Sequence, residues 1–530
     1  MSAESVAAGR PAALGSAARR GEARGLTRRA SLTAAAGILD YAAKALVYVV
    51  VTPILVSGLG RTVYGIWEML SRLGGYMTVT DGRSTEALRL VIAQKQESPD
   101  DGEKRRTVGA ALMVWLLMLP VVLAAGVVLV AWVAPALIRP EGALQGDVQL
   151  TLAILAGAFV ATSLGLVPES VLRGMNLGYK RVGVQASLNI LGGALAAAAV
   201  WQGLGLVGLA AAQAVKVVLA GLVFWMLVRR FVSWWGTARP TRPEVRALFG
   251  MSLWLMAGDA VAKLLLATDV LILGAIVAPA VVTTYALTGY AARTAVGLHV
   301  FAAGAAMPGL GGLLGAGEHD RAAAARREML VLTWLFVTVI GGAILLWNPA
   351  FIRLWVGPEN YAGAGIDLLI VLIAVQTAFI RTDAYLLDAA LEPKARVLVA
   401  SAAAVVTIGL TIPLTHLFGL PGLCAGLLAG RGVQSVAYPL LVRRSLRHPR
   451  RHAGGLRLGL RLGLVSGGLF AGCAALGRAL QPVGWIEWGA GLALSLPVIA
   501  GLALLGGPDA TTRRALLSRL HAMASRGAHP

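Results

Sequence analysis

The chain has 530 residues, of which 57% are hydrophobic and 14% are charged, and its mean hydropathy is +0.73. A soluble domain of this length cannot bury so much apolar surface, so the composition excludes a soluble globular protein and predicts an all-α protein that crosses the membrane many times. The net charge of +21 would suit nucleic-acid binding, but the positive charges are distributed as the positive-inside rule requires, which excludes that class.

The first 32 residues are rich in Ala, Gly and Ser and contain six Arg. This composition predicts a basic, disordered cytoplasmic tail over residues 1–32. Residues 27–32 resemble a twin-arginine export signal, but the apolar stretch that follows is too long for a signal peptide and contains Asp40 and Lys44. We therefore expect this stretch to be the first membrane-spanning helix.

Fourteen stretches are long and apolar enough to span hydrocarbon. Their approximate cores are 33–57, 63–93, 107–133, 148–168, 182–202, 205–228, 247–276, 281–313, 329–347, 366–390, 397–418, 420–442, 458–478 and 485–506. Lys and Arg concentrate in alternate loops, and the loops on the other side contain only Arg61, Arg139, Arg353 and Arg478. The positive-inside rule then predicts an even number of helices with both termini in the cytoplasm.

The first twelve stretches contain an internal repeat. Asp40-Tyr-Ala-Ala-Lys44 in the first matches Asp259-Ala-Val-Ala-Lys263 in the seventh, and Arg72 in the second matches Arg293 in the eighth. Two units of six helices are a parallel repeat about an axis along the membrane normal. We expect an N-terminal lobe over 33–232, a C-terminal lobe over 233–445, a linker with helices 13 and 14 over 446–506, and a cytoplasmic tail over 507–530.

Ionisable side chains inside the predicted spans are the candidate functional residues. A charge at the bilayer centre costs about 2.5–3.5 kcal/mol on insertion scales, so such residues usually face a bundle interior or a wet cavity. Asp40 and Lys44 are four residues apart on one helix face, as are Asp259 and Lys263. Each pair could be a structural ion pair, or its lysine could present an ammonium group to a cavity.

Arg72 and Arg293 occupy matching positions in the two repeats. Across a pseudo-two-fold axis they would face a shared cavity, where a guanidinium could bind phosphate in a bidentate manner. The alternative is that they pair with neighbouring carboxylates such as Glu68 or Asp269. We take Arg72, Arg293, Lys44 and Lys263 as candidate substrate-binding residues, together with Arg381. Asp40, Asp259, Asp269 and Glu68 are candidate ion-coupling residues.

Several stretches resemble the polysaccharide branch of the multidrug/oligosaccharidyl-lipid/polysaccharide exporter superfamily, which moves precursors of O-antigen and exopolysaccharide. They are Thr52-Pro53 to Trp67, Asp81-Gly82 with Ala87-Leu88-Arg89, Met307-Pro308 with Gly317-Glu318-His319-Asp320, and Leu354-Trp355-Val356-Gly357. The segment after Asp81 departs from the family pattern, because the family usually has an apolar residue before the glycine and fewer charges after it. The resemblance spans most of residues 31–444.

This resemblance implies a flippase of the bacterial inner membrane that moves undecaprenyl-diphosphate-linked oligosaccharide by alternating access. Its partners would be that lipid-linked substrate, membrane lipids, and a polysaccharide polymerase with its export machinery, without nucleic acid. No cofactor, metal or catalytic residue is expected, since the two cysteines, Cys424 and Cys473, lie in apolar segments without a metal-binding pattern.

Two other functions stay open from the sequence. A drug/cation antiporter of the same superfamily would use a carboxylate such as Asp259 or Asp269 as its cation site. A membrane glycosyltransferase or ligase would need a large outer domain or a loop that carries carboxylates, and only Glu359 marks the longest outer loop.

Overall fold

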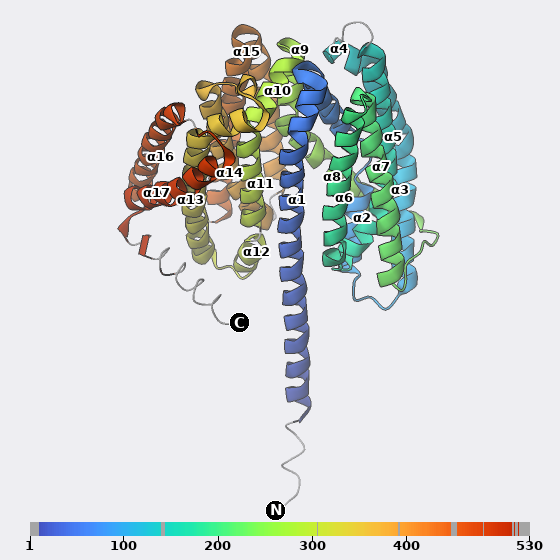
Figure 1. The fold of residues 1–530 in the computed structure, drawn as a ribbon. Coiled ribbons are helices and arrows are strands. Elements are labelled where there is room, and N and C mark those ends of the chain that lie inside the picture. The colour runs from blue at the N-terminus through green and yellow to red at the C-terminus, as the bar shows by residue number, and fades with distance from the viewer. Residues whose placement is uncertain are drawn as a thin grey trace, which may run out of the picture. The chain divides into compact units, whose positions relative to one another are not determined.

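The computed structural model describes residues 10–138, 144–304, 306–390, 393–446, 453–480 and 482–510, with positions 513, 514 and 518 (Figure 1). This part of the chain is helical and contains no strand, which confirms the predicted all-α class. Its α-helices are α1 (Arg10–Tyr76), α2 (Ser84–Gln94), α3 (Asp101–Val128), α4 (Ala134–Ile138), α5 (Leu144–Gly174), α6 (Val182–Trp201), α7 (Gly205–Phe231), α8 (Arg242–Leu266), α9 (Thr268–Ile276), α10 (Pro279–Thr288), α11 (Tyr290–Gly304), α12 (Met307–Gly315), α13 (His319–Val356), α14 (Ala364–Ala389), α15 (Pro393–Ser445), α16 (Ala453–Ala479) and α17 (Trp485–Gly506).

Eleven helices of the described residues are long and apolar enough to cross a membrane, or twelve if the bent pair α11 and α12 forms one span. The predicted number of fourteen is therefore not confirmed. Part of the difference lies in α1 and α15, which each join two helices across a glycine with non-helical backbone angles. Gly60 has φ +75° and Gly419 has φ +60°, a region that glycine reaches without steric cost.

Helix α1 begins at Arg10, so the chain is helical over residues 10–32, where we expected a disordered tail. Alanine and arginine are both strong helix formers, and they dominate this stretch. Residues 1–9 of the predicted tail lie outside the described residues, as do most of the predicted tail over 507–530 and the linker positions 447–452.

The predicted seventh and eighth spans are divided in the structure. The seventh is broken at Ala267, between α8 and α9, and the eighth is broken at Gly289, between α10 and α11. A helix break at membrane depth requires new partners for the freed backbone groups. Arg431 supplies such a partner at the first break, and Arg293 supplies one at the second.

The chain divides into two compact units. Unit 1 comprises residues 1–59 and 73–260, and unit 2 comprises residues 60–72 and 261–530. The borders fall inside α1 and α8, whereas the predicted lobes meet at residues 232 and 233. The two-fold repeat therefore remains a prediction from the sequence. The two compact units divide the chain at other residues than the predicted lobes do.

In unit 1, α5 and α7 pack closely along their length. They approach at two glycines, where a Cβ atom added to Gly165 would lie 3.0 Å from Cα of Gly221. Small residues at such crossings let helix backbones come together in a membrane. Apolar side chains of α2, α3, α5 and α7 form the adjoining core, which includes Leu88, Val114 and Leu172.

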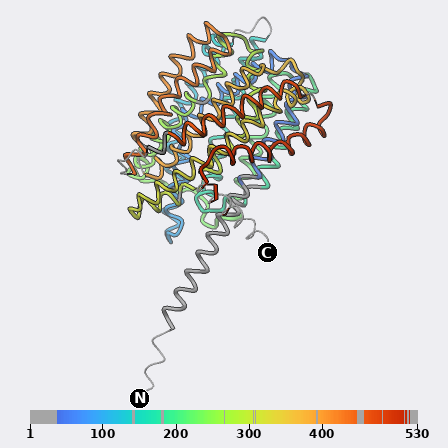
Figure 2. The backbone as a smooth tube through the Cα atoms, turned by 90° about the vertical axis from the view of Figure 1, so that its left-hand side faces the viewer, coloured from blue at the N-terminus to red at the C-terminus, as the bar shows by residue number. Residues whose placement is uncertain are grey.

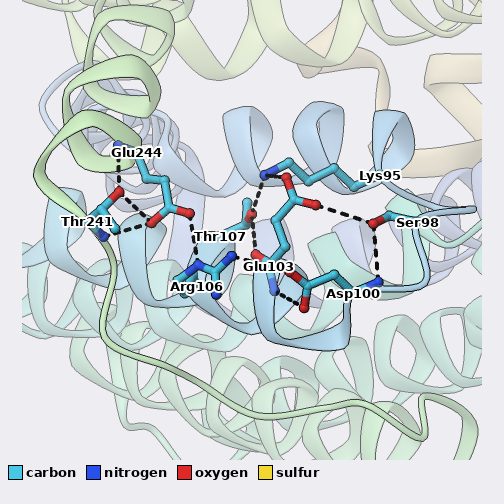
Figure 3. A network of polar contacts seen from close by, with 8 residues as sticks. All are labelled: Lys95, Ser98, Asp100, Glu103, Arg106, Thr107, Thr241 and Glu244. Atoms are coloured by element: carbon cyan, nitrogen blue, oxygen red, sulfur yellow. Dashed lines mark hydrogen bonds and ion pairs between the residues drawn. The ribbon is translucent and has the colours of Figure 1, made fainter.

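A polar network in unit 1 joins the N-terminal ends of α3 and α8 (Figure 3). Glu103 of α3 forms an ion pair with Lys95, with 2.9 Å between Oε1 and Nζ. The guanidinium of Arg106 lies 3.1 Å from the carboxylate of Glu244 and 3.4 Å from that of Asp100. The side chain of Asp100 caps α3, because it accepts the amide N–H of Glu103 at 3.0 Å. That hydrogen bond lowers the pKa of Asp100, which stays ionised at neutral pH.

The segment 232–241, which connects α7 to α8, is held against α3. The side chain of Arg105 donates from Nε to the carbonyl of Trp234 at 2.8 Å, and its backbone carbonyl accepts the amide N–H of Ala238 at 3.1 Å. Gly109 permits this contact, since a Cβ atom there would lie 2.1 Å from the carbonyl oxygen of Ala238. The connection between the two sequence repeats is therefore a fixed part of unit 1.

Unit 2 includes residues 60–72 of α1, which pack on α9 and α10. A Cβ atom on Gly65 would lie 1.9 Å from the carbonyl oxygen of Pro279. Nearby, Arg61 donates from Nη2 to Oγ1 of Thr284 at 2.7 Å, and the hydroxyl of Thr283 donates to the carbonyl of Arg61 at 2.6 Å. Backbone contact and hydrogen bonds together fix this short segment.

The two arms of α15 fold back on each other about Gly419. Gly426 and Gly430 in the second arm face Thr411 and Thr407 in the first, and added Cβ atoms would lie 2.5 and 2.3 Å from the threonine Cα atoms. Only glycine allows helices to approach this closely.

The last two helices, α16 and α17, pack against α13 in unit 2. They are the red elements nearest to the viewer in Figure 2. Two tryptophans of α13 hold them, because Trp334 donates from Nε1 to the hydroxyl of Ser466 at 2.9 Å and Trp347 donates to Ser495 at 2.9 Å. Gly491 lies directly against the Trp347 ring.

Candidate functional site

The structure distributes the predicted site residues between the two units. Lys44 lies in unit 1, and the remaining predicted substrate-binding residues, Lys263, Arg72, Arg293 and Arg381, lie in unit 2. The matching arginines of the two repeats thus fall in one unit, since residues 60–72 pack with the second half of the chain. Of the predicted ion-coupling residues, Asp40 and Asp259 lie in unit 1, and Glu68 and Asp269 lie in unit 2.

One polar cluster of unit 1 lies between α1, α6 and α7. The ammonium group of Lys44 contacts Oδ2 of Asp40 at 2.8 Å, which is the ion pair that their spacing allowed. Oδ1 of Asp40 accepts a hydrogen bond from Nδ2 of Asn189 at 2.9 Å. The side chain of Lys44 is 55% exposed and that of Asp40 is 20% exposed, so the lysine is the accessible member of the pair.

Lys216 of α7 adds a second ammonium group to this cluster. It lies close enough to Lys44 for the two positive charges to repel each other. Its stem packs on Gly192, where an added Cβ atom would lie 2.4 Å from Cδ of Lys216. Among the described residues, Lys216 makes no ion pair or hydrogen bond, so the cluster of two lysines and one aspartate is net positive.

Asp259 also lies in unit 1, but its partners differ from the predicted one. Its two oxygens contact Nη2 of Arg83 at 3.6 Å and the hydroxyl of Thr78 at 2.9 Å. Arg83 reaches it from a tight turn with φ +51°, in which the Arg83 amide donates to Oδ1 of Asp81 at 2.8 Å. Arg83 therefore neutralises Asp259.

In unit 2, Asp269 lies in the first turn of α9, directly after the break at Ala267. It accepts the hydroxyl of Tyr285 at 2.8 Å and its neighbouring amide, that of Val270, at 2.9 Å. The guanidinium of Arg293 lies 5.8 Å from the centre of the Tyr285 ring and donates to the carbonyl of Ala286. Arg293 remains exposed, and its contact supplies the break between α10 and α11 with a hydrogen-bond donor.

Arg431 of α15 stabilises the other break. It is 7% exposed and donates to the carbonyl of Leu265 at 3.0 Å and to the hydroxyl of Thr377 at 2.9 Å. Leu265 lies two residues before the break, where a continuous helix would have supplied an amide donor. When the two repeats are aligned, Arg431 lies within one position of Lys216. Each of these side chains extends from the sixth helix of its repeat towards the first helix of the same repeat.

The other predicted residues have varied surroundings. Glu68 accepts the hydroxyl of Tyr64 at 3.0 Å, and Lys263 is half-buried. Arg72 and Arg381 are half-buried, and neither makes a hydrogen bond or ion pair with the residues that the structure describes. Arg381 lies near enough to Asp388 for the two charges to interact, whereas an unpaired guanidinium inside a membrane helix, such as that of Arg72, is available to bind an anion.

Two buried carboxylates of α14 are not among the residues that the sequence analysis selected. Asp367, in the first turn of α14, is 1% exposed. Asp383 forms a buried bidentate ion pair with Arg326, at 2.8 and 2.9 Å. Asp383 and Arg326 are far apart in the sequence, so no local sequence pattern predicts that they form a pair.

Comparison with known proteins identifies the family and the fold. Residues 28–312, more than half of the chain, match the family model described as polysaccharide biosynthesis protein. No curated relative matches the sequence.

Among solved structures, the fold is similar to the lipid II flippase MurJ in an inward closed conformation, with 12% identity, a TM-score of 0.63, and coverage of 89% of this chain and 97% of that one. It is also similar to an inward-facing multidrug resistance transporter of the MATE family, with 16% identity, a TM-score of 0.62, and coverage of 77% and 98%. A eukaryotic MATE transporter has 17% identity, a TM-score of 0.55, and coverage of 80% and 97%. Because the sequence identities are this low, the structural similarity establishes the fold alone.

Proposed function

Because this chain belongs to the polysaccharide biosynthesis protein family of the multidrug/oligosaccharidyl-lipid/polysaccharide exporter superfamily, we propose that it is a flippase for undecaprenyl-diphosphate-linked oligosaccharide. Transport would proceed by alternating access across the bacterial inner membrane, with both termini in the cytoplasm. Family and fold are those of multi-pass transporters and flippases rather than of enzymes.

The observation that carries the substrate class is the net positive cluster of Lys44 and Lys216 around the single carboxylate of Asp40. Two ammonium groups among spanning helices are costly unless an anion neutralises them. A diphosphate headgroup supplies that charge and offers oxygens to both donors. An uncharged sugar or a cationic drug would leave the repulsion between the lysines in place.

Arg72, Arg293 and Arg381 are the further candidates for contact with the diphosphate or with an acidic sugar, assisted by Lys263. Arg293 is exposed, and neither Arg72 nor Arg381 forms an ion pair or a hydrogen bond with the described residues. A planar guanidinium matches two phosphate oxygens at once, so each of these groups suits the proposed substrate better than it suits a cation.

Replacing Lys216 with methionine is expected to reduce polymer export by about tenfold or more. The reason is that a hydrogen bond to a charged group is worth about 1.5–3 kcal/mol, and 1.4 kcal/mol corresponds to a tenfold change. Export is measured as surface polymer in a deletion strain that carries each variant at equal membrane abundance. Lys394→Met is the matched control, because Lys394 is exposed and has no described contact. Equal export from Lys216→Met and Lys394→Met would exclude Lys216 from the site.

Arg72→Ala and Arg293→Ala are each expected to abolish export while leaving the amount of protein in the membrane unchanged. The same strain measures both properties. Normal export from both variants would remove the arginines from the substrate site and leave the lysine cluster as the remaining candidate.

The alternative function is a drug/cation antiporter, as the multidrug transporters of this fold suggest. Its candidate cation sites are already occupied by protein donors. Asp40 contacts Lys44, Asp259 contacts Arg83, and Asp269 accepts a tyrosine hydroxyl. Drug sensitivity of the deletion strain with intact surface polymer would favour the antiporter and reject the flippase.

A further inference from the structure

The turn that joins α16 to α17, residues 482–486, exposes a continuous apolar surface. Val483 and Ile486 are each 88% exposed, the highest fraction for a large hydrophobic side chain in the described part of the chain, and Trp485 is 47% exposed. Single exposed apolar residues are ordinary, but three in one short turn form a patch that fits an apolar partner. The substrate site proposed above does not include this turn.

An aromatic cluster fixes the turn against α13. The ring centres of Trp485 and Phe351 are 6.0 Å apart, and that of Trp488 lies 5.5 Å from Phe351 and 5.8 Å from Trp485. Phe351 in turn stacks on Trp355, with 5.0 Å between the ring centres. Nε1 of Trp488 also donates to the carbonyl of Trp347 at 3.3 Å. Aromatic pairs of this geometry attract one another beyond the effect of burial, so the apolar patch has a rigid support.

The contacts with Phe351 also place the turn along α13. Helix α13 continues for five residues beyond Phe351, to Val356, which at 1.5 Å per residue adds about 8 Å. The connection to α14 follows, with Pro358 and Glu359 exposed. Because α13 is long and apolar enough to cross the membrane, the α16–α17 turn lies nearer to the membrane centre than the α13–α14 connection does.

The backbone groups of the turn have partners within unit 2. The amide N–H of Val483 donates to Oε2 of Glu487 at 2.7 Å, and the carbonyl of Pro482 accepts from Nη2 of Arg353 at 2.6 Å. Pro482 itself has no amide N–H to satisfy. A turn in water does not require such partners, because water supplies them, whereas irregular backbone close to hydrocarbon does.

The patch is continuous with a surface that faces lipid. Helices α16 and α17 are both long and apolar enough to cross the membrane. Their exposed side chains on either side of the turn include Leu476 of α16 and Leu494 of α17. Val483 and Ile486 extend this apolar surface around the end of the helical pair.

Two charged side chains limit the depth of the turn. Arg478 of α16 and Glu487 of α17 are both exposed close to it. An exposed guanidinium or carboxylate needs water or lipid headgroups within reach of its side chain. The turn therefore fits the boundary between headgroups and acyl chains, and it does not fit the hydrocarbon centre.

We propose that the α16–α17 turn is inserted into the interfacial region of the bilayer, with Val483 and Ile486 among the first acyl carbons and the Trp485 indole at the level of the glycerol groups. Tryptophan prefers this level because its ring is apolar and its N–H is polar. In the predicted topology, this end of unit 2 faces the outer leaflet. The leaflet adapts to a helical pair that ends below its neighbour, so it is thinner beside α16 and α17 than beside the α13–α14 connection.

The alternative occupant of the patch is another protein, bound in water beyond the membrane. The turn lies below the α13–α14 connection, and its backbone groups at Pro482 and Val483 are already occupied. A protein partner would gain few hydrogen bonds from such a surface, whereas lipid requires none.

The experiment attaches a nitroxide spin label to Ile486→Cys in the full-length protein in lipid nanodiscs. Collisions of the label with oxygen, which dissolves in lipid, and with a water-soluble nickel chelate measure its depth. The native Cys424 and Cys473 are buried, so the unmodified protein is the blank. Because the side chain of Ile486 is 88% exposed, its replacement leaves the fold unchanged. The measurement involves no transport, so its result is independent of the flippase proposal.

Glu359→Cys and Leu494→Cys are the matched controls, because both residues are exposed, one in the α13–α14 connection and the other two turns inside α17. The ratio of oxygen to nickel collisions at residue 486 is expected to be several-fold above that at residue 359 and below that at residue 494. A ratio equal to that at residue 359 would overturn the proposal and leave the patch to a protein partner. A ratio equal to that at residue 494 would also contradict it, since the turn would then lie in the hydrocarbon.

Discussion

Replacing Asp383 of α14 with alanine is expected to destabilise unit 2 by about 3–5 kcal/mol, because it leaves the guanidinium of Arg326 buried without its counter-charge. Nε and Nη2 of Arg326 donate to the two oxygens of Asp383 at 2.8 and 2.9 Å. The two side chains are only 13% and 5% exposed. The loss of stability is measured as the difference in the free energy of unfolding between the variant and the unmodified protein in mixed detergent and lipid micelles.

Two comparisons test the cause of that loss. Arg326→Met combined with Asp383→Leu removes both charges and is expected to cost less than Asp383→Ala alone, since apolar pairs often replace buried ion pairs at little cost. Glu318→Ala breaks the exposed pair with Arg321, whose side chains are 39% and 74% exposed, and should cost below about 1 kcal/mol. A similar loss in Asp383→Ala and Glu318→Ala would contradict the burial of the pair.

Replacing Gly65 with leucine is expected to abolish export and to lower the thermal stability of unit 2. An added Cβ atom would lie 1.9 Å from the carbonyl oxygen of Pro279, and a backbone atom cannot move aside as a flexible side chain can. Overpacking in a tight site costs about 1–3 kcal/mol or more. The displaced segment would also lose the hydrogen bond from Arg61 to Thr284.

Gly157→Leu is the matched control for this substitution. Gly157 lies inside α5, is exposed, and has no atom within 4 Å of the added Cβ position. It should export polymer normally and unfold at the temperature of the unmodified protein. Normal export from Gly65→Leu would show that residues 60–72 of α1 can separate from α9 and α10 without cost to transport.

The all-α class followed from composition, and one of the breaks followed from local sequence. Gly60 lies between the predicted spans 33–57 and 63–93, and its positive φ marks the break there. The break at Ala267 has no such signal, because no glycine or proline interrupts the apolar run around it. Arg431, 166 residues later, supplies the donor that makes this break possible.

The same distinction applies to the charged residues. Helical spacing allowed an ion pair between Asp40 and Lys44, and the two side chains are in contact. Identical spacing suggested that Asp259 pairs with Lys263, but Asp259 instead contacts Arg83, which reaches it from a left-handed turn. Spacing shows which residues share a helix face, and the choice of partner is made by tertiary packing. Asp367 was not selected for the same reason, since its hydrogen-bond partners Asn348 and Tyr361 lie in other segments.

The two tryptophans of α13 have a consequence for how the chain is made. Trp334 and its acceptor Ser466 are 132 residues apart, and Trp347 and Ser495 are 148 apart. At a synthesis rate of about 5–20 residues per second, α13 leaves the ribosome on the order of ten seconds before its partners. During that interval both indole N–H groups need temporary acceptors, from interfacial water, lipid headgroups or the insertion machinery. Docking of the last helical pair is thus a late assembly step, and a ribosome stalled before α16 would leave a chain with two tryptophans exposed to quality control.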